Sequence, residues 1–230
     1  MSELTTYLIT GASRGKHTTC TAYRGFRNEA DICAASLIGL GKGLLEELLL
    51  RPKVIIIAAL RDPSSSGELL HKLGVGEGSK LIVVKIDSIS ERDAESAIRL
   101  LKTEHNISKL DVVIANSGIA KPIGSVLDTP TSEMRDHFEV NTIGPLTLFQ
   151  AAWPLLNNAS RPKFVVISSH AGSIGDMEHE PFEMLAYGVS KTAVNFLVRR
   201  IHLSYPSLIA FPIHPGYDHL RLLQDCCAVF

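Results

Sequence analysis

A tyrosine and a lysine stand four residues apart in the pentapeptide Y-G-V-S-K, which runs from Tyr187 to Lys191. On a helix this spacing places the phenol and the ammonium on one face. A phenol has a reference pKa of about 10, and a cation held beside it favours the phenolate and lowers that value toward neutral pH. The pair could therefore pass a proton to or from a substrate oxygen. The same spacing also arises by chance on helix surfaces, so the neighbouring residues must decide.

A glycine-rich segment, T-G-A-S-R-G from Thr10 to Gly15, lies far upstream at the end of the first apolar run. Glycines after a strand let the backbone approach a pyrophosphate at a helix N-terminus, although they also suit an ordinary turn. Arg61 follows the second apolar run, where a guanidinium matches a ribose 2′-phosphate. With Arg14 as a second positive charge, this favours NADP over NAD. Either arginine could instead be a solvated surface charge.

Polar residues close the next two apolar runs as well. Asp87 and Ser88 follow one run, and Asn116, Ser117 and Gly118 follow the other. Asp87 and Ser88 could bond the adenine of a cofactor. For each of these residues an ordinary turn or helix cap is an equally good interpretation.

The elements that would position these residues alternate along the chain between short apolar runs and longer amphipathic ones. Predicted strands occupy Tyr7–Thr10, Lys53–Ala59, Lys80–Ile86, Leu110–Ala115, Lys163–Ser168 and Leu208–His214. Predicted helices occupy Leu40–Leu50, Glu68–Leu73, Glu91–His105, Ser132–Leu156 and Ala186–Tyr205. This order predicts an α/β fold of three layers, a doubly wound, Rossmann-like parallel sheet with ligands at the carboxyl ends of its strands.

Length and composition are those of one globular domain. The chain has 230 residues, of which 45% are hydrophobic and 20% charged, and its net charge is −1. Without a basic block we expect no nucleic-acid partner, and without a signal pattern or a long apolar run we expect a cytoplasmic protein with no membrane contact. The four cysteines and nine histidines show no metal-ligand spacing, so no metal is expected.

Taken together, these motifs resemble the short-chain dehydrogenase/reductase superfamily. Its pattern is T-G-x-x-x-G-x-G, then an Asp, N-N-A-G, an Asn, a Ser and Y-x-x-x-K, and it matches from about Leu4 to Gly216. Here N-N-A-G reads A-N-S-G, with Ala115 and Ser117 as mild departures. Phrases such as K-F-V-V-I-S-S, A-Y-G-V-S-K and I-A-F-P-I-H-P-G are similar to the fungal norsolorinic-acid-ketoreductase-like group of polyketide pathways.

The resemblance implies a catalytic role for four residues. Tyr187 would protonate the carbonyl oxygen during reduction, while Lys191 would lower the pKa of that phenol and bind the nicotinamide ribose. Ser169 would hydrogen-bond the carbonyl, and Asn141 would hold a proton-supplying water chain through a local disruption of its helix. Ser168 and Ser173 are weaker candidates for the serine role, and a structural serine is the alternative for all three.

The resemblance also implies where the cofactor and the substrate would lie. Cofactor contacts would come from the glycine-rich turn, the strand ends and the H-P-G segment: Gly11, Ser13, Arg14, Gly15, Ile38, Gly39, Arg61, Asp87, Asn116, Gly118, Lys191, Pro215 and Gly216. The interval from Ser169 to Tyr187, 18 residues, is several longer than the family's usual one. The excess, roughly Gly175 to Glu183, would shape the substrate pocket.

Two segments depart strongly from the family pattern. The 22 residues from Lys16 to Leu37 are inserted inside the phosphate-binding turn and show neither helical nor strand periodicity. They separate glycines that act within one tight turn, so the helix N-terminus would no longer face the pyrophosphate, unless the insert forms an extruded loop. After Gly216 the expected lid and last strand do not follow, and 217–230 is atypical. All four cysteines lie in these two segments, which suggests translated non-coding sequence or a divergent lineage.

Two functions are therefore open. One is an NADPH-dependent ketoreductase or alcohol dehydrogenase acting on an aromatic polyketide-like ketone or a related small carbonyl. The other is a catalytically impaired or non-enzymatic relative that keeps the fold as one domain spanning 1–230. By resemblance, pairing of the two long helices would give a homodimer or tetramer.

Overall fold

The computed structural model describes residues 4–12, 30–64, 70–121, 125–179 and 183–216, with side chains of the first helix described from Gly39 onward. Six strands form one sheet: β1 Thr5–Thr10, β2 Val54–Leu60, β3 Lys80–Lys85, β4 Val112–Ala115, β5 Lys163–Ile167 and β6 Ile209–Ile213. All five pairings are parallel and the order is β3-β2-β1-β4-β5-β6. The predicted doubly wound parallel sheet is confirmed.

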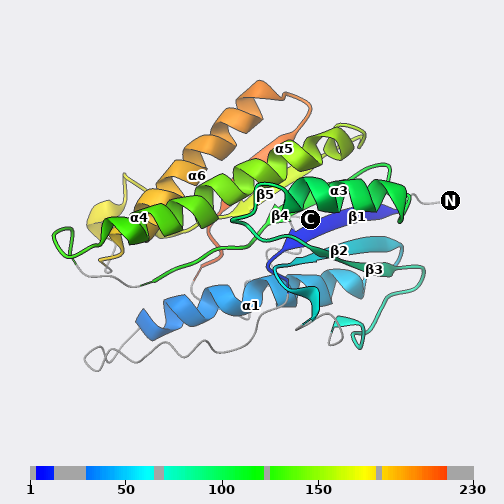
Figure 1. Ribbon diagram of the computed structural model, residues 1–230, viewed down its shortest axis with the longest axis horizontal. Helices are drawn as coiled ribbons and strands as arrows, with labels where there is room; N and C mark the ends of the chain where they lie inside the picture. Colours follow the sequence, from blue (N-terminus) through cyan, green and yellow to red (C-terminus); the bar gives the residue numbers. More distant parts are fainter. Residues whose placement is uncertain (1–3, 13–29, 65–69, 122–124, 180–182, 217–230) are drawn as a thin grey trace.

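Helices cover both faces of this sheet (Figure 1). The helical elements are α1 Ala30–Leu49, α3 Asp93–Thr103, α4 Thr131–Phe138, α5 Gly144–Leu156 and α6 Leu185–Ser204, with short 3-10 turns η2 His170–Gly172 and η3 Met177–His179. In Figure 1, α1 lies along one face, while α3, α5 and α6 lie along the other. The predicted helix Glu68–Leu73 falls partly outside the described residues.

Strand alternation divides the core into two apolar clusters, one on each face. On the α1 face, Tyr7 and Ile9 of β1 pack with a row of buried leucines: Leu40, Leu44, Leu45, Leu48 and Leu49. On the other face, Leu8 joins Phe164 of β5 and side chains of α3, α5 and α6, including Leu101, Phe149 and Val198. The continuous apolar strands therefore need both layers of helices, as a parallel sheet does.

The predicted long helix over Ser132–Leu156 is broken at its centre. A π turn, η1 Glu139–Ile143, separates α4 from α5 and contains Asn141. Pro145 follows in the first turn of α5, and its ring nitrogen has no N–H to donate to the π turn before it. The local disruption expected at Asn141 is thus observed.

The first helix begins much earlier than the sequence predicted. We expected it at Leu40, with no helical period in 16–37, but α1 starts at Ala30, so the last eight residues of that segment are helical. The stretch A-D-I-C-A-A-S-L is rich in good helix formers, and extending an existing helix costs little once Leu44 and Leu48 anchor it to the sheet. In Figure 1 the early turns of α1 project beyond the carboxyl ends of the strands.

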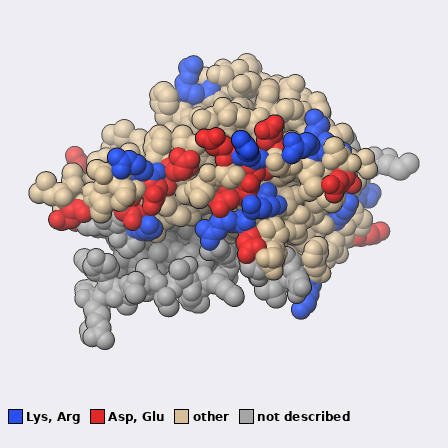
Figure 2. All heavy atoms as spheres, in the orientation of Figure 1, with Lys and Arg blue, Asp and Glu red and all other residues tan. Residues whose placement is uncertain are grey.

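Charged side chains of both signs are interspersed over the face that carries α3, α4 and α5 (Figure 2). Within the described ranges, no helix is both long enough and apolar enough to cross a bilayer.

Candidate active site

The tyrosine and lysine of the Y-G-V-S-K segment lie in the first turns of α6, and both are buried. Tyr187 is 1% exposed and Lys191 3% exposed. The Lys191 ammonium lies 5.6 Å from the centroid of the Tyr187 ring, and its Nζ donates a hydrogen bond of 2.7 Å to the carbonyl oxygen of Ile167. The i to i+4 spacing therefore brings the two groups together as predicted, and Lys191 also ties α6 to the end of β5.

Burial changes the acidity of this lysine. Loss of solvation lowers the pKa of Lys191 from 10.5 to about 8. At pH 7 the amine is still mostly protonated, so a cation is held beside the phenol in a region of low dielectric constant. Such a cation stabilises a phenolate when the phenol gives up its proton.

Asn141 holds the loop that follows β4. Its Oδ1 accepts from the Ile119 N–H at 2.9 Å, and its Nδ2 donates to the Ile119 carbonyl at 2.9 Å. The same Nδ2 lies 2.9 Å from Ser190 Oγ, which in turn donates to the Tyr187 carbonyl at 2.7 Å. The π turn thus fastens both the loop and the catalytic helix.

Ser190 is a site residue that the sequence prediction missed. It lies inside the pentapeptide, three residues after Tyr187, and is 1% exposed. Its carbonyl also accepts from Thr142 Oγ1 at 3.0 Å. A serine on the buried face of a helix, beside two residues already singled out, was the available signal.

The three candidate serines have different surroundings. Ser169 follows β5 with an extended backbone and caps η2, accepting from the Ala171 N–H at 3.3 Å. Ser168 is buried and donates to Asn195 Oδ1 at 2.6 Å, and Ser173 donates to Asp176 at 2.9 Å. Ser169 is therefore the one whose hydroxyl proton is not bound to a carboxylate or amide oxygen in these contacts.

The turn after β1 is closely packed. Gly11 has φ +68°, a conformation that favours glycine. Thr10 Oγ1 accepts from the N–H groups of Asn116 and Ser117 at 3.0 and 3.1 Å, and Asn116 Nδ2 donates to the Thr10 carbonyl at 3.0 Å. These hydrogen bonds join the ends of β1 and β4. They bring together Gly11 and Asn116, two of the predicted cofactor residues.

Gly41, the last glycine of the I-G-L-G stretch at 38–41 and not one of the predicted site residues, brings α1 against this turn. A Cβ on Gly41 would lie 2.6 Å from the Gly11 carbonyl oxygen and 2.3 Å from Asn116 Nδ2. A Cβ on the predicted cofactor residue Gly39 would meet nothing within 4 Å. Ile38 and Gly39 lie eight and nine residues into α1, about 12 Å from its start at 1.5 Å per residue. Their N–H groups are inside the helix and unavailable to a phosphate.

The remaining predicted residues lie at strand ends. Asp87 follows β3, with Oδ1 3.3 Å from the Ile89 N–H, and shares a small pocket of about 10 Å³ with Thr10, Ser117 and Gly144. Arg61 is exposed directly after β2. Beyond β6, Pro215 is buried and Gly216 has φ +81°.

Gly118 lies beside the catalytic groups: a Cβ there would lie 3.1 Å from Asn141 Oδ1 and 3.7 Å from Lys191 Nζ. Ser13, Arg14, Gly15 and the segment 217–230 lie outside the described residues.

The fit to a nicotinamide dinucleotide differs along the site. The strand ends offer a tight glycine turn at Gly11 and a pocket beside Asp87, and the catalytic end offers a buried Tyr187 and Lys191. Within the part of the chain that the structure describes, the feature that does not fit is the start of α1, which lies at Ala30 rather than at Ile38. The fold is that of a dinucleotide-binding α/β protein, and it brings the buried side chains of Tyr187 and Lys191 together in the first turns of α6.

The sequence profile described as short chain dehydrogenase matches residues 32–217. The chain belongs to this family, whose members are oxidoreductases that interconvert alcohols and carbonyls. The match begins after β1 and the glycine-rich turn, where the sequence departs from the family pattern.

Several curated fungal proteins are similar to this chain. The chain is 38% identical to a norsolorinic acid ketoreductase of Dothistroma septosporum, covering 94% of this chain and 73% of that one. It is 36% identical to the norsolorinic acid ketoreductase of Aspergillus parasiticus, covering 94% and 71%. A short chain dehydrogenase of Penicillium aethiopicum is 42% identical over 81% of this chain and 74% of its own length. The resemblance to the norsolorinic-acid-ketoreductase group is confirmed.

Solved structures share the fold. An NADPH-bound carbonyl reductase from chicken fatty liver has a TM-score of 0.73 at 24% identity, covering 94% of this chain and 77% of that one. The Sniffer protein of Caenorhabditis elegans has a TM-score of 0.78 at 21% identity, covering 100% of this chain and 91% of that one.

Proposed function

We propose that this protein is an NADPH-dependent ketoreductase of fungal secondary metabolism, acting on an aromatic polyketide-like ketone. The observation that carries the proposal is the buried Tyr187 beside the Lys191 cation, linked through Ser190 to Asn141. The named activity of the Dothistroma and Aspergillus relatives supports the ketone as substrate class.

Each residue has a distinct part in the proposed reduction. Bound NADPH supplies the hydride that reaches the carbonyl carbon. Tyr187 donates its phenolic proton to the carbonyl oxygen, and the Lys191 ammonium stabilises the phenolate that remains. Ser169 donates a hydrogen bond to the same oxygen while negative charge develops. Asn141 keeps the π turn open for a water chain that returns the proton.

The cofactor would be held at the carboxyl ends of the strands. Arg61 would pair with the 2′-phosphate, which favours NADPH over NADH, and Asp87 would bond the adenine. Asn116 and Gly118 would line the adjoining ribose. Of the turn residues, Gly11 keeps the conformation that a close backbone approach requires.

The substrate side is apolar near Ser169. Ile174 and Met177, in the segment after β5, are 71% and 61% exposed. Apolar side chains there suit the flat rings of an aromatic ketone, because binding would remove both surfaces from water.

A homodimer or tetramer would bury an apolar stripe. Val189, Phe196 and Leu203 recur every seven residues along α6 and are 41%, 71% and 54% exposed, and Phe138 on α4 is 41% exposed. A heptad of exposed apolar residues is typical of a helix that packs against another helix. The proposed partner is a second copy of this chain.

One observation favours a second candidate, a catalytically impaired relative in which 16–37 is an insert in a single domain. Because α1 begins at Ala30, the N–H groups of Ile38 and Gly39 are bonded within the helix. A pyrophosphate would lose the helix N-terminus that normally holds it.

The test is NADPH oxidation at 340 nm with a panel of aromatic ketones, for the wild type and Tyr187→Phe. The phenylalanine keeps the buried ring and removes only the transferable proton. We expect turnover in the wild type and a loss of about 10²–10⁴-fold in the variant. No turnover by the wild type, with measurable NADPH binding, would favour the impaired relative. Equal turnover by both proteins would exclude Tyr187 as the acid.

A further inference from the structure

The loop after β4, from Gly118 to Lys121, is fastened to the helix beside it at two successive points. Asn141 binds both backbone groups of Ile119. Two residues further along, the N–H of Lys121 donates to His137 Nε2 at 3.2 Å. His137 and Asn141 are four residues apart in the helical segment, and they bind two loop residues, Lys121 and Ile119, that are two apart.

The contacts of His137 show which ring nitrogen carries the proton. Its Nδ1 lies 2.8 Å from the carbonyl oxygen of Glu133, which can only accept, so Nδ1 carries a proton. Nε2 receives the Lys121 N–H and therefore carries none. The ring is fully buried at 0% exposure and both nitrogens have hydrogen-bond partners, with a Glu133 carboxylate oxygen 3.7 Å from Nδ1.

His137 also contacts the proposed acid. Its ring meets the Tyr187 ring edge to face, with centroids 6.4 Å apart and planes at 76°. This contact crosses from α4 to α6, which pack against each other. One imidazole thus touches the catalytic tyrosine and holds the loop whose Gly118 lies beside Lys191 Nζ.

We infer that His137 is a positioning residue for the proposed reduction. In its Nδ1–H form it holds the loop Gly118–Lys121 and the Tyr187 ring in a fixed position relative to each other. The inference rests on the proposed function for its effect on turnover. This role could not be predicted from the sequence, because a lone histidine on an amphipathic helix has no motif around it.

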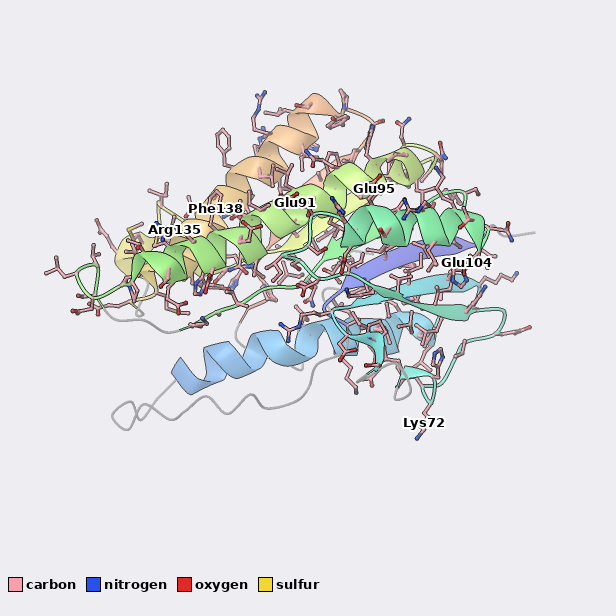
Figure 3. All side chains as sticks on the ribbon, in the orientation of Figure 1. Lys72, Glu91, Glu95, Glu104, Arg135 and Phe138 are labelled. Atoms are coloured by element: carbon pink, nitrogen blue, oxygen red, sulfur yellow. The ribbon has the colours of Figure 1, made fainter. Side chains whose placement is uncertain are left out.

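Two substitutions distinguish the role of His137 as a hydrogen-bond acceptor from its role as an aromatic ring. His137→Gln can place an amide oxygen near the position of Nε2 and accept from Lys121, whereas His137→Phe keeps an aromatic ring and removes the acceptor. Arg135→Ala, an exposed change on the same helix (Figure 3), is the matched control. Melting temperatures of all variants establish that they fold.

The first readout does not depend on turnover. Amide hydrogen exchange at Lys121 should quicken at least about tenfold in His137→Phe and stay near the wild-type rate in His137→Gln and Arg135→Ala. Nitrogen-15 spectra of the wild-type ring should report a protonated Nδ1 and a bare Nε2. Unchanged Lys121 exchange in His137→Phe, or a proton on Nε2, would overturn the inference.

The second readout is kcat for the ketone at saturating NADPH. We expect a fall of about tenfold or more in His137→Phe, because small displacements of a catalytic group are costly, with recovery in His137→Gln. Wild-type kcat in both variants would overturn the positioning role. Inactive wild-type protein with the expected exchange pattern would count against the proposed function alone and support the anchoring of the loop.

Discussion

The two ends of the candidate site are built in different ways. At the catalytic end, Tyr187 and Lys191 are fixed by α6, and Asn141 and Ser190 join α6 to the π turn through direct hydrogen bonds. At the other end, beside the Gly11 turn where a pyrophosphate would bind and which we call the phosphate end, the start of α1 decides whether its first N–H groups face the turn. The helix begins at Ala30, about 12 Å before Ile38. Gly41, further along α1, still packs against the Gly11 turn.

This contrast separates two kinds of structural requirement. Side chains on one helix keep their relative positions as long as the helix exists, so the catalytic end tolerates changes elsewhere. An anion binds at a helix N-terminus through the first N–H groups, which have no partner inside the helix. Extending the helix at its start therefore moves these N–H groups away from the turn, even though the packing of Gly41 is unchanged. Tyr187, Lys191, Asn141 and Ser190 lie together at one end, while at the other end Gly41 packs on the Gly11 turn although α1 begins at Ala30.

After Tyr187→Phe, the largest effect expected at the catalytic end of the site is that of Lys191→Met. Removing the cation should lower turnover about 10²–10³-fold, since the phenolate loses its stabilising charge. Because the pKa of Lys191 is about 8, wild-type reduction should also weaken as the pH rises above 8 and the amine becomes neutral. Steady-state rates from pH 6 to 10 measure both effects. A rate in the variant within fivefold of wild type would contradict the role of Lys191.

The same substitution has a stability signature. Between pH 8 and 10.5 the unfolded chain keeps a proton that folded Lys191 has released, so wild-type stability rises with pH across this window. The methionine variant lacks that contribution. The stability of the variant relative to wild type should therefore be greatest below pH 8 and should fall toward pH 10.5. Thermal unfolding of both proteins across this pH range measures the difference. A constant difference across the window would show that burial does not shift this pKa.

A smaller effect is expected from paired glycine substitutions in α1. Gly41→Ala should destabilise by about 1–3 kcal/mol, because its Cβ would overlap the Gly11 carbonyl and Asn116. Gly39→Ala, which meets open space inside a helix, should be neutral or stabilise by up to about 1 kcal/mol. Urea unfolding of both variants decides. Equal effects would mean that α1 does not pack on the turn as described.

The smallest effect is expected at the proposed 2′-phosphate contact. Arg61→Ala should weaken NADPH binding about tenfold and leave NADH binding nearly unchanged, since only NADPH carries the phosphate. Fluorescence titration with both cofactors measures the ratio. Equal losses for the two cofactors would assign Arg61 a structural role.

Much of this arrangement could be predicted from the sequence, and the reasons for the failures are specific. The parallel sheet followed from continuous apolar strands, and the Tyr187–Lys191 pair from helical spacing. His137 and Ser190 were missed because their roles depend on which helices face each other, which periodicity does not reveal. Gly41 belongs to the I-G-L-G stretch that continues the family's glycine pattern, but the predicted cofactor residues ended at Gly39, because the pattern does not reveal which glycine packs against the turn.

The prediction of where α1 begins was wrong for another reason. Residues 30–37 carry no clear amphipathic period, yet their helix propensity suffices once the leucines beyond Gly39 anchor the helix to the sheet. Tertiary contacts at one end of a segment thus decided the structure at the other.

The central claim is that the phosphate end is interrupted by the segment 16–37 while the catalytic end is intact. It is tested most directly by titrating NADPH, followed by fluorescence, into the 230-residue chain and into a chain lacking 16–37. The deletion rejoins Gly15 to Ile38 and should return a helix N-terminus to the turn, so we expect it to bind NADPH at least about tenfold more tightly. Equal affinities would contradict the claim, because the cofactor would then be held without that feature.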